Sequence, residues 1–221
     1  MTTGWATLGD NRYYFNAPNG DMVTGTKAID GREYTFDASG VCQNLMTSIM
    51  GATQTNVDAM TNAYNRTATY PSRVMTAGGA PTARDFCQII YEEAAAEGVR
   101  AEVLWSQIMN ETGWHKFGGD VKPEQYNFGG LGATGGGVGG ATFSDVRTGI
   151  RAQVQHLKCY ASTEPTKNPV VDPRWHLVRR GSAPYVEWLG IKENPNGTGW
   201  AARAEYGYKL IDLMRSKLGV W

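Results

Sequence analysis

A pattern that occurs twice near the start of the chain constrains the fold more than any other feature. The segments GWATLGDNRYYF and GTKAIDGREYTF align with Gly4 on Gly25 and Phe15 on Phe36, a period of about 21 residues. Their alternating aromatic residues, followed by the turn sequences NAPNG and DASG, predict short β-hairpins. A hairpin this small cannot bury its own apolar face, so it must stack on a neighbour. We therefore expect a β-hairpin repeat module over residues 1–42.

The rest of the chain carries apolar residues at helical spacing. Residues 43–54 are expected to form a linker and residues 55–221 a helical domain. Helices are predicted within residues 55–66, 82–97, 100–112, 144–162, 184–190 and 200–218. Thr82, with Asp85 at the third helical position, predicts the start of one helix, and Gly98 predicts its end. The fold class is expected to be α+β and mainly α.

Composition excludes several classes of partner. The chain has 21 Lys and Arg against 21 Asp and Glu, so no net field gathers nucleic acid or an anionic membrane. No apolar run approaches the roughly 20 residues of a membrane span, and the start lacks a signal-peptide pattern. The three cysteines and three histidines show no metal-ligand spacing. We expect no nucleic acid partner, no membrane insertion, no metal and no cofactor.

One glutamate stands at an unusual place. In MNETGWHKFGG, Glu111 falls near the end of the helix predicted over residues 100–112. An acid at a helix C-terminus opposes the macrodipole and gains no stability there. This placement is typical of a carboxyl retained for chemistry.

A glycine-rich segment, residues 126–140, follows the glutamate. So many glycines favour neither a helix nor a regular strand. Two interpretations remain open: a flexible loop, or a backbone that lies close to a ligand because glycine permits close approach.

These segments together resemble the glucosaminidase domain of glycoside hydrolase family 73, over about residues 55–219. The family pattern Q-x-x-x-E-S/T-G-W is matched by Gln107, Glu111, Thr112, Gly113 and Trp114, and N-x-x-G-I/L by Asn127, Gly130 and Leu131. The segment TFSDVRTGIRAQVQHL matches the third motif, while Trp200, Ala201 and Tyr206 match the Y-A-x-x-x-x-Y helix with Trp in place of the first Tyr. The resemblance implies a lysozyme-like helical domain and hydrolysis of the β-1,4 bond after N-acetylglucosamine in peptidoglycan.

The resemblance also assigns roles to single residues. Glu111 is the expected general acid, and Trp114 is expected to supply part of an apolar wall that keeps its carboxyl protonated. The catalytic glutamate of lysozyme, which lies beside a tryptophan, shows the same pattern. The expected substrate-binding residues are Trp114, Tyr126, Asn127, Phe128, Gly130 and Trp200.

The second catalytic group is not evident from the sequence. Family members often carry a carboxylate before the third motif, where this chain has GATGGGVGGAT. Asp145 is one candidate, although it also fits a helix cap, and Asp120 and Glu124 flank the loop entry. The favoured hypothesis is that the 2-acetamido group of the substrate assists, or that Tyr206 and loop backbone position a water.

The N-terminal pattern resembles the choline-binding type of cell-wall-binding repeat. In that family an aromatic cage holds a cation, and the cage positions here are Trp5, Tyr13, Tyr14 and Tyr34. The second repeat departs from the pattern, since Thr26 stands where the first has Trp5. The alternative is a hairpin spacer that packs against the next domain.

Three further alternatives stay open. A muramidase or a lytic transglycosylase uses the same scaffold and cuts after N-acetylmuramic acid. A non-catalytic wall-binding protein is the third. The expected partners are bacterial peptidoglycan and wall polymers. The expected location is extracellular or in the cell wall for an autolysin, and the host cytoplasm before release to the wall for a phage lysin.

Overall fold

The computed structural model describes residues 2–9, 11–29, 32–43 and 45–220, and they form two compact units. The first unit is Met1–Met46 and the second is Thr47–Trp221. Each unit is described by itself below. Within the described residues, no helix has both the length and the hydropathy needed to cross a membrane.

The first unit consists of antiparallel strands. Strands β1 (Gly4–Leu8), β2 (Asn11–Asn16) and β3 (Asp21–Met22) form one sheet in that order, and β4 (Gly25–Ile29) pairs with β5 (Arg32–Phe36). Gly4 pairs with Phe15 and Gly25 with Phe36, so both copies of the repeat fold into a hairpin of the same register. The predicted hairpins are confirmed. Their small core comprises Val23, Ile29 and Phe36, with Trp5, Tyr14, Tyr34 and Cys42 packed against it.

The second unit is mainly helical, which confirms the expected fold class. Its α-helices are α1 (Val57–Thr67), α2 (Ser72–Ala77), α3 (Ala83–Glu97), α4 (Ala101–Thr112), α5 (Val146–Ala161) and α6 (Tyr206–Leu213). Single-turn helices are η1 (Pro123–Gln125), η2 (Trp175–Leu177) and η3 (Val186–Leu189), and η4 (Met214–Leu218) continues α6 as a π-turn. Most of the expected helices are therefore present. The segment 184–190 forms only the short η3.

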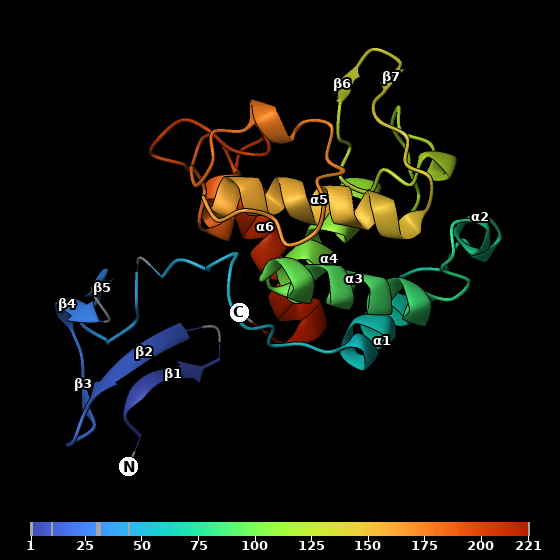
Figure 1. The fold of residues 1–221 in the computed structure, drawn as a ribbon. Coiled ribbons are helices and arrows are strands. Elements are labelled where there is room, and N and C mark those ends of the chain that lie inside the picture. Colours follow the sequence, from blue (N-terminus) through green and yellow to red (C-terminus); the bar gives the residue numbers. More distant parts are fainter. Residues whose placement is uncertain (1, 10, 30–31, 44, 221) are drawn as a thin grey trace. The chain divides into compact units, whose positions relative to one another are not determined.

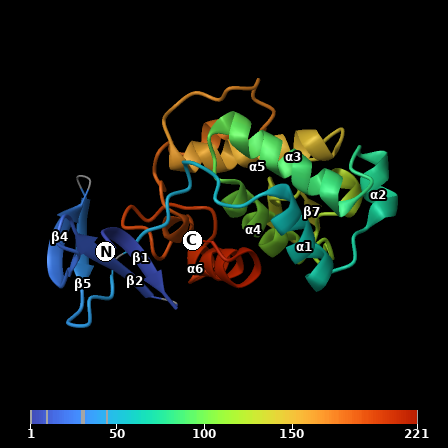
Figure 2. The same cartoon turned by 90° about the horizontal axis from the view of Figure 1, so that it is seen from below.

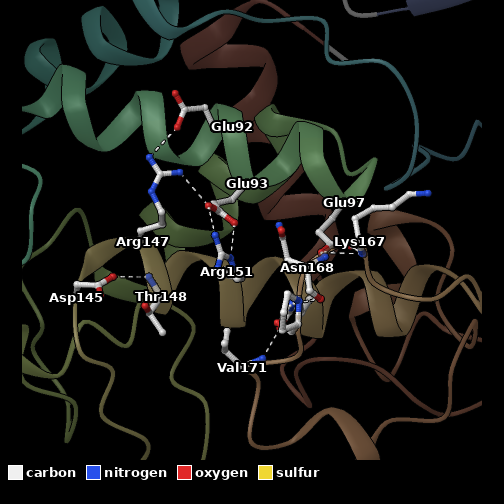
Figure 3. A network of polar contacts seen from close by, with 12 residues as sticks. Glu92, Glu93, Glu97, Asp145, Arg147, Thr148, Arg151, Lys167, Asn168 and Val171 are labelled. Atoms are coloured by element: carbon white, nitrogen blue, oxygen red, sulfur yellow. Dashed lines mark hydrogen bonds and ion pairs between the residues drawn. The ribbon is translucent and has the colours of Figure 1, made fainter.

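Helices α3 and α5 lie side by side in both views (Figures 1 and 2), and ion pairs connect them. The Glu93 carboxylate accepts from Arg147 at 2.9 Å and from Arg151 at 2.8 Å, as Figure 3 shows. Because Glu93 is 3% exposed, these two cations compensate the loss of its hydration. Helix α3 begins with the predicted capping box of Thr82 and Asp85.

Residues 47–54 lie in the second unit, although the sequence predicts them as part of a linker. Ile49 is fully buried, and its carbonyl accepts from the amide of Arg100 at 3.0 Å. The Thr47 amide and hydroxyl both donate to Glu187. Backbone amides and carbonyls hold most of this segment in place, and such contacts leave no periodic signal in the sequence.

The glycine-rich segment forms a short hairpin, contrary to the expectation of no regular strand. Strand β6 (Ala133–Gly135) pairs with β7 (Val138–Gly139), and the hairpin extends away from the helices of its unit in Figure 1. Gly136 and Gly137 at its tip have φ angles of 65° and 90°, which the side-chain-free residue adopts readily. The glycines therefore build a tight turn.

Helix α6 starts six residues later than predicted, at Tyr206 and not at Trp200. The amides of Trp200 and Ala201 donate instead to the Leu189 carbonyl, at 2.8 and 3.1 Å. Glu205 has a φ of 61°, which prevents the helix from extending backwards. This irregular segment carries Trp200 into the site described next.

Candidate active site

Helix α4 carries Glu111 to the wall of a cavity. Residues Ala101–Met109 of this helix are fully buried, so packing fixes its position on all sides. The helix ends at Gly113, whose φ of 56° lets the Trp114 amide bond back to the Met109 carbonyl at 2.9 Å. Glu111 in the last turn lines a cavity of about 200 Å³. A rigid helix thus presents one carboxyl at its exposed end.

Two donors hold the Glu111 carboxyl. The Tyr206 hydroxyl, at the start of α6, donates to Oε1, and the indole N–H of Trp200 donates as well. Behind them, Gln107 Nε2 donates to the Tyr206 oxygen at 3.3 Å, and Gln153 Nε2 donates to Gln107 Oε1 at 3.0 Å. Tyr206, Gln107 and Gln153 are all buried. The network fixes the orientation of the carboxyl.

Burial dominates the electrostatics of the acid. Desolvation raises the pKa of Glu111 to about 6, and the hydrogen bonds from Tyr206 and Trp200 oppose part of this rise because they favour the charged form. Glu111 as a whole residue is exposed to solvent. Its carboxyl nevertheless lines a cavity, where water reaches it but hydrates it less fully than bulk water would. Burial and the Glu111 charge raise the pKa of Tyr206 well above its ordinary value, so this hydroxyl remains a donor.

The same cavity contains a second acid and an aromatic ring. Asp120 and Phe117 line it together with Glu111, Asn127 and Gly130. A pair of carboxyls that flank one cavity can protonate a leaving oxygen and activate a water. No three His, Cys, Asp or Glu side chains gather as a metal site would require in the parts of the chain that the structure describes.

Asn127 organises the loop that forms the cavity floor. Its Nδ2 donates to the carbonyls of Leu131 and Ala141, at 2.9 and 3.0 Å, and its Oδ1 accepts from the Leu131 amide at 2.8 Å. The residue is 2% exposed. It therefore joins the two ends of the glycine-rich hairpin and acts mainly on loop shape.

Two parts of the chain match known protein families. Residues 87–218 match the family model described as "Mannosyl-glycoprotein endo-beta-N-acetylglucosaminidase". The chain belongs to this glucosaminidase family. Residues 2–42 match a choline-binding repeat. Both matches confirm the resemblances seen in the sequence, and the description of the first family is that of a glycoside hydrolase.

One curated protein is also similar. An "Uncharacterized protein" of Borreliella burgdorferi is 46% identical over 123 residues, which is 56% of this chain and 57% of that protein. The chain thus spans little more than half the length of this relative.

The structure brings most of the expected glucosaminidase site together. Glu111, Asn127 and Gly130 line one cavity, and Trp200 and Tyr206 reach it through their hydrogen bonds to Glu111. Tyr206 is 4% exposed and already engaged by two partners. It is therefore placed to position Glu111, and its role in positioning a water stays a prediction.

Trp114 lies elsewhere in the glucosaminidase unit. It lines a different cavity of about 410 Å³ with Lys209 and Asp212, and its ring packs edge-on against Trp105 at 5.5 Å. The left-handed Gly113 turns the chain away before Trp114, so this side chain leaves the face that Glu111 occupies. Trp200 is the tryptophan that touches the acid.

Asp145 also lies away from Glu111. It caps α5, where its Oδ1 accepts from the Thr148 amide at 2.7 Å (Figure 3), and it lines another cavity with Gly78 and Arg147. The pKa of Asp145 is lowered although burial opposes this, because the Thr148 amide and the Ser144 hydroxyl favour its charged form. The capping role explains this residue.

Two expected substrate-binding aromatics belong to the core. Phe128 is fully buried and packs against Phe86 at 5.0 Å. Tyr126 is 8% exposed. Its carbonyl oxygen lies so close to Gly149 of α5 that a Cβ added to this glycine would be only 1.8 Å away. Both residues anchor the loop, and neither offers a free face for a sugar.

The aromatic residues of the repeats contact one another. Trp5 packs edge-on against Tyr14 at 5.3 Å and Tyr34 at 4.8 Å, and the Arg12 guanidinium lies 5.3 Å from the Trp5 ring centre. Tyr13 points to the other face of β2, since successive residues of a strand alternate. The Arg12 guanidinium thus lies against the ring of one expected cage residue.

Sequence reasoning missed Gln153 and Phe117. Gln153 lies on the inner side of α5 between Ile150 and Val154, and it is fully buried. The signal available in the sequence for Gln153 was a polar residue inside an apolar stripe. No such signal marks Phe117, because its φ of 47° and the turn that follows α4 depend on tertiary packing.

Proposed function

We propose that this glucosaminidase hydrolyses the β-1,4 bond after N-acetylglucosamine in peptidoglycan, as an endo-β-N-acetylglucosaminidase. The observation that carries the proposal is Glu111, a carboxyl with a pKa of about 6 at a cavity wall. The family description names an endo-β-N-acetylglucosaminidase activity for its own members, and the choline-binding repeat favours a wall polymer as the substrate here.

In this mechanism Glu111 protonates the leaving glycosidic oxygen. An acid catalyst must be protonated when substrate binds, and a pKa of about 6 leaves a useful protonated fraction at neutral pH. Proton loss then gives a carboxylate that Tyr206 and Trp200 stabilise by donating to it. The two donors therefore assist the state that follows proton transfer.

We assign the second carboxyl role to Asp120. Of the three acids that the sequence offers, Asp120 lines the Glu111 cavity, whereas Asp145 caps α5 and Glu124 is exposed on η1. Its task is to take a proton from the attacking water, as the base does in an inverting glycosidase. This assignment replaces the hypothesis that the substrate needs no second acid.

The repeat unit would hold the enzyme on its substrate. Tethering a hydrolase to an insoluble polymer raises the local concentration of cleavable bonds. Peptidoglycan and associated wall polymers are then the partners, and the cell wall or its outside is the place of action.

Digestion of purified cell walls tests the proposal. Products are reduced with borohydride and analysed by mass spectrometry, for wild type, Glu111→Gln and the exposed control Glu124→Gln. We expect reduced N-acetylglucosamine ends from wild type and Glu124→Gln and none from Glu111→Gln. Reduced N-acetylmuramic acid ends would indicate a muramidase, anhydro ends a lytic transglycosylase, and undigested walls a binding protein.

A further inference from the structure

A second cavity adjoins that of Glu111. It measures about 240 Å³ and shares Gly130 and Ala133 with the first as lining residues. Trp200 lines this second cavity and donates its indole N–H to Glu111. The two cavities therefore lie next to each other along the segment that contains Gly130 and Ala133.

His156 forms part of its wall, and the buried Asp172 pairs with it from outside the lining. His156 is 7% exposed, and its Nδ1 lies 2.7 Å from Asp172 Oδ2. Asp172, itself 4% exposed, also accepts from the Arg174 amide at 2.9 Å. A carboxylate at Nδ1 requires the proton on that nitrogen, which leaves Nε2 for a ligand. The pair thus fixes the orientation of the imidazole.

The cavity also carries a guanidinium that forms no ion pair among the described residues. It belongs to Arg174, which is half-buried. Its charge acts on the neighbouring Tyr160, where it opposes the burial that raises the pKa of the phenol. No Asp or Glu of the described chain lines the cavity. A sheltered guanidinium without a counter-ion is a site for an anion.

The remaining walls suit a sugar. Trp200 and Tyr160 offer aromatic surface, and the loop from Gly129 to Gly132 offers backbone with little side-chain cover. Trp200 is held edge-on against the His156 ring at 5.0 Å, so the aromatic wall and the imidazole keep a fixed geometry. Aromatic faces with a few directed polar groups are typical of small-ligand sites.

We propose that this cavity binds the sugar next to the cut N-acetylglucosamine by a carboxylate that the sugar carries, with Arg174 pairing with the carboxylate and His156 Nε2 contributing a hydrogen bond. The inference rests on the proposed function and deepens it. It says that the enzyme selects peptidoglycan by recognising a carboxylate on N-acetylmuramic acid, the sugar that alternates with N-acetylglucosamine. Two sources supply this carboxylate: a free lactyl group, or the peptide attached to it.

The test compares kcat/KM on three soluble glycans. They are chitotetraose, which has no carboxylate, the N-acetylglucosamine–N-acetylmuramic acid tetrasaccharide without peptide, and the same glycan with its peptide. The variants are Arg174→Gln, Arg174→Lys and the exposed control Arg179→Gln. The readout is the preference ratio, kcat/KM on each anionic glycan divided by that on chitotetraose.

We expect Arg174→Gln to lower this ratio by about tenfold or more, the size of a charge-assisted hydrogen bond, with Arg174→Lys intermediate and Arg179→Gln like wild type. A fall for the peptide-free glycan identifies the lactyl carboxylate as the source, and a fall for the peptide-bearing glycan alone identifies the peptide. An unchanged ratio in Arg174→Gln overturns the inference.

Binding to the Glu111→Gln variant separates failure of this inference from failure of the proposed function. Titration with the peptide-free and the peptide-bearing tetrasaccharides is followed by NMR at the His156 ring and the Arg174 side chain. Shifts with either anionic glycan that chitotetraose does not produce support the site even if wild type cleaves none of the glycans. Equal shifts with all three glycans, or none, overturn it.

Discussion

Glu111 experiences two influences on its pKa that act in opposite directions. Burial raises it, and the donors Tyr206 and Trp200 lower it, with burial the larger effect. The result is an acid that titrates near pH 6 and so can both give and regain a proton. Because single hydrogen-bond donors contribute to this pKa, a conservative substitution that removes one donor is expected to shift it.

Tyr206→Phe is predicted to move the basic limb of the pH profile of kcat/KM to higher pH. The general acid must be protonated, so activity falls as pH rises through the pKa of Glu111. Loss of a donor that favours the carboxylate raises that pKa further. Tyr208→Phe, which changes an exposed tyrosine on the same helix, should leave the limb in place. A limb that stays unchanged in Tyr206→Phe would show that this residue has only a structural role.

Asp120→Asn is predicted to lose about 10²- to 10⁴-fold in kcat, the usual contribution of a general base, while Asp145→Asn retains turnover and loses some stability through its cap. Initial rates on a soluble glycan and thermal melting check both. Azide should partly restore Asp120→Asn with an inverted glycosyl azide as product. Full activity in Asp120→Asn would return the role to the 2-acetamido group of the substrate.

At the scale of elements, a glycine in α5 lets the loop that contains Tyr126 and Phe128 pack closely against this helix. A Cβ at Gly149 would lie 1.8 Å from the Tyr126 carbonyl oxygen, and 3.4 Å from the Phe128 ring. The loop that carries Asn127 therefore crosses α5 at the closest possible approach. This contact positions the floor of the Glu111 cavity.

Gly149→Ala is predicted to destabilise the protein by about 1–3 kcal/mol, the usual cost of overpacking, even though alanine favours helices. Gly118→Ala is the matched control, because a Cβ there meets no atom within 4 Å. Urea denaturation followed by circular dichroism measures both. Equal stability of the two variants would contradict the packing described here.

Periodic elements could be predicted from sequence, and irregular ones could not. The stripe of Val146, Ile150, Val154 and Leu157 predicts α5 because one helix face buries all four. The motif around Glu111 likewise locates the acid. Asp172, in contrast, lies in the proline-rich segment TEPTKNPVVDPRW, which carries no helical or strand periodicity, and it is buried where it pairs with His156 of α5. Such pairing depends on tertiary structure, so no local pattern signals it.

At the scale of the molecule, we propose that one unit binds the cell wall and the other cleaves the glycan. The helical unit contains the cavity and the acid, and the repeat unit has its own small core around Phe36. Separate cores let wall binding and cleavage respond to different substitutions. The family matches fall on the same two parts of the chain.

Trp5→Ala is predicted to abolish co-sedimentation with purified walls and to leave kcat/KM on a soluble glycan unchanged. The substitution removes the ring that contacts Tyr14, Tyr34 and Arg12. Tyr13→Ala, on the other face of its strand, serves as the control and should keep more binding. Undiminished sedimentation of Trp5→Ala would favour the hairpin spacer over a wall-binding module.

The pKa of one carboxyl is the quantity on which the proposed mechanism depends most directly. It can be measured by ¹³C NMR titration of the glutamate side chains, with Glu111→Gln used to assign the Glu111 signal. We predict a transition at about pH 6 for this signal. A transition at the ordinary glutamate value, near 4.5, would mean that burial does not outweigh the two donors, and it would contradict the proposed role of Glu111 as proton donor.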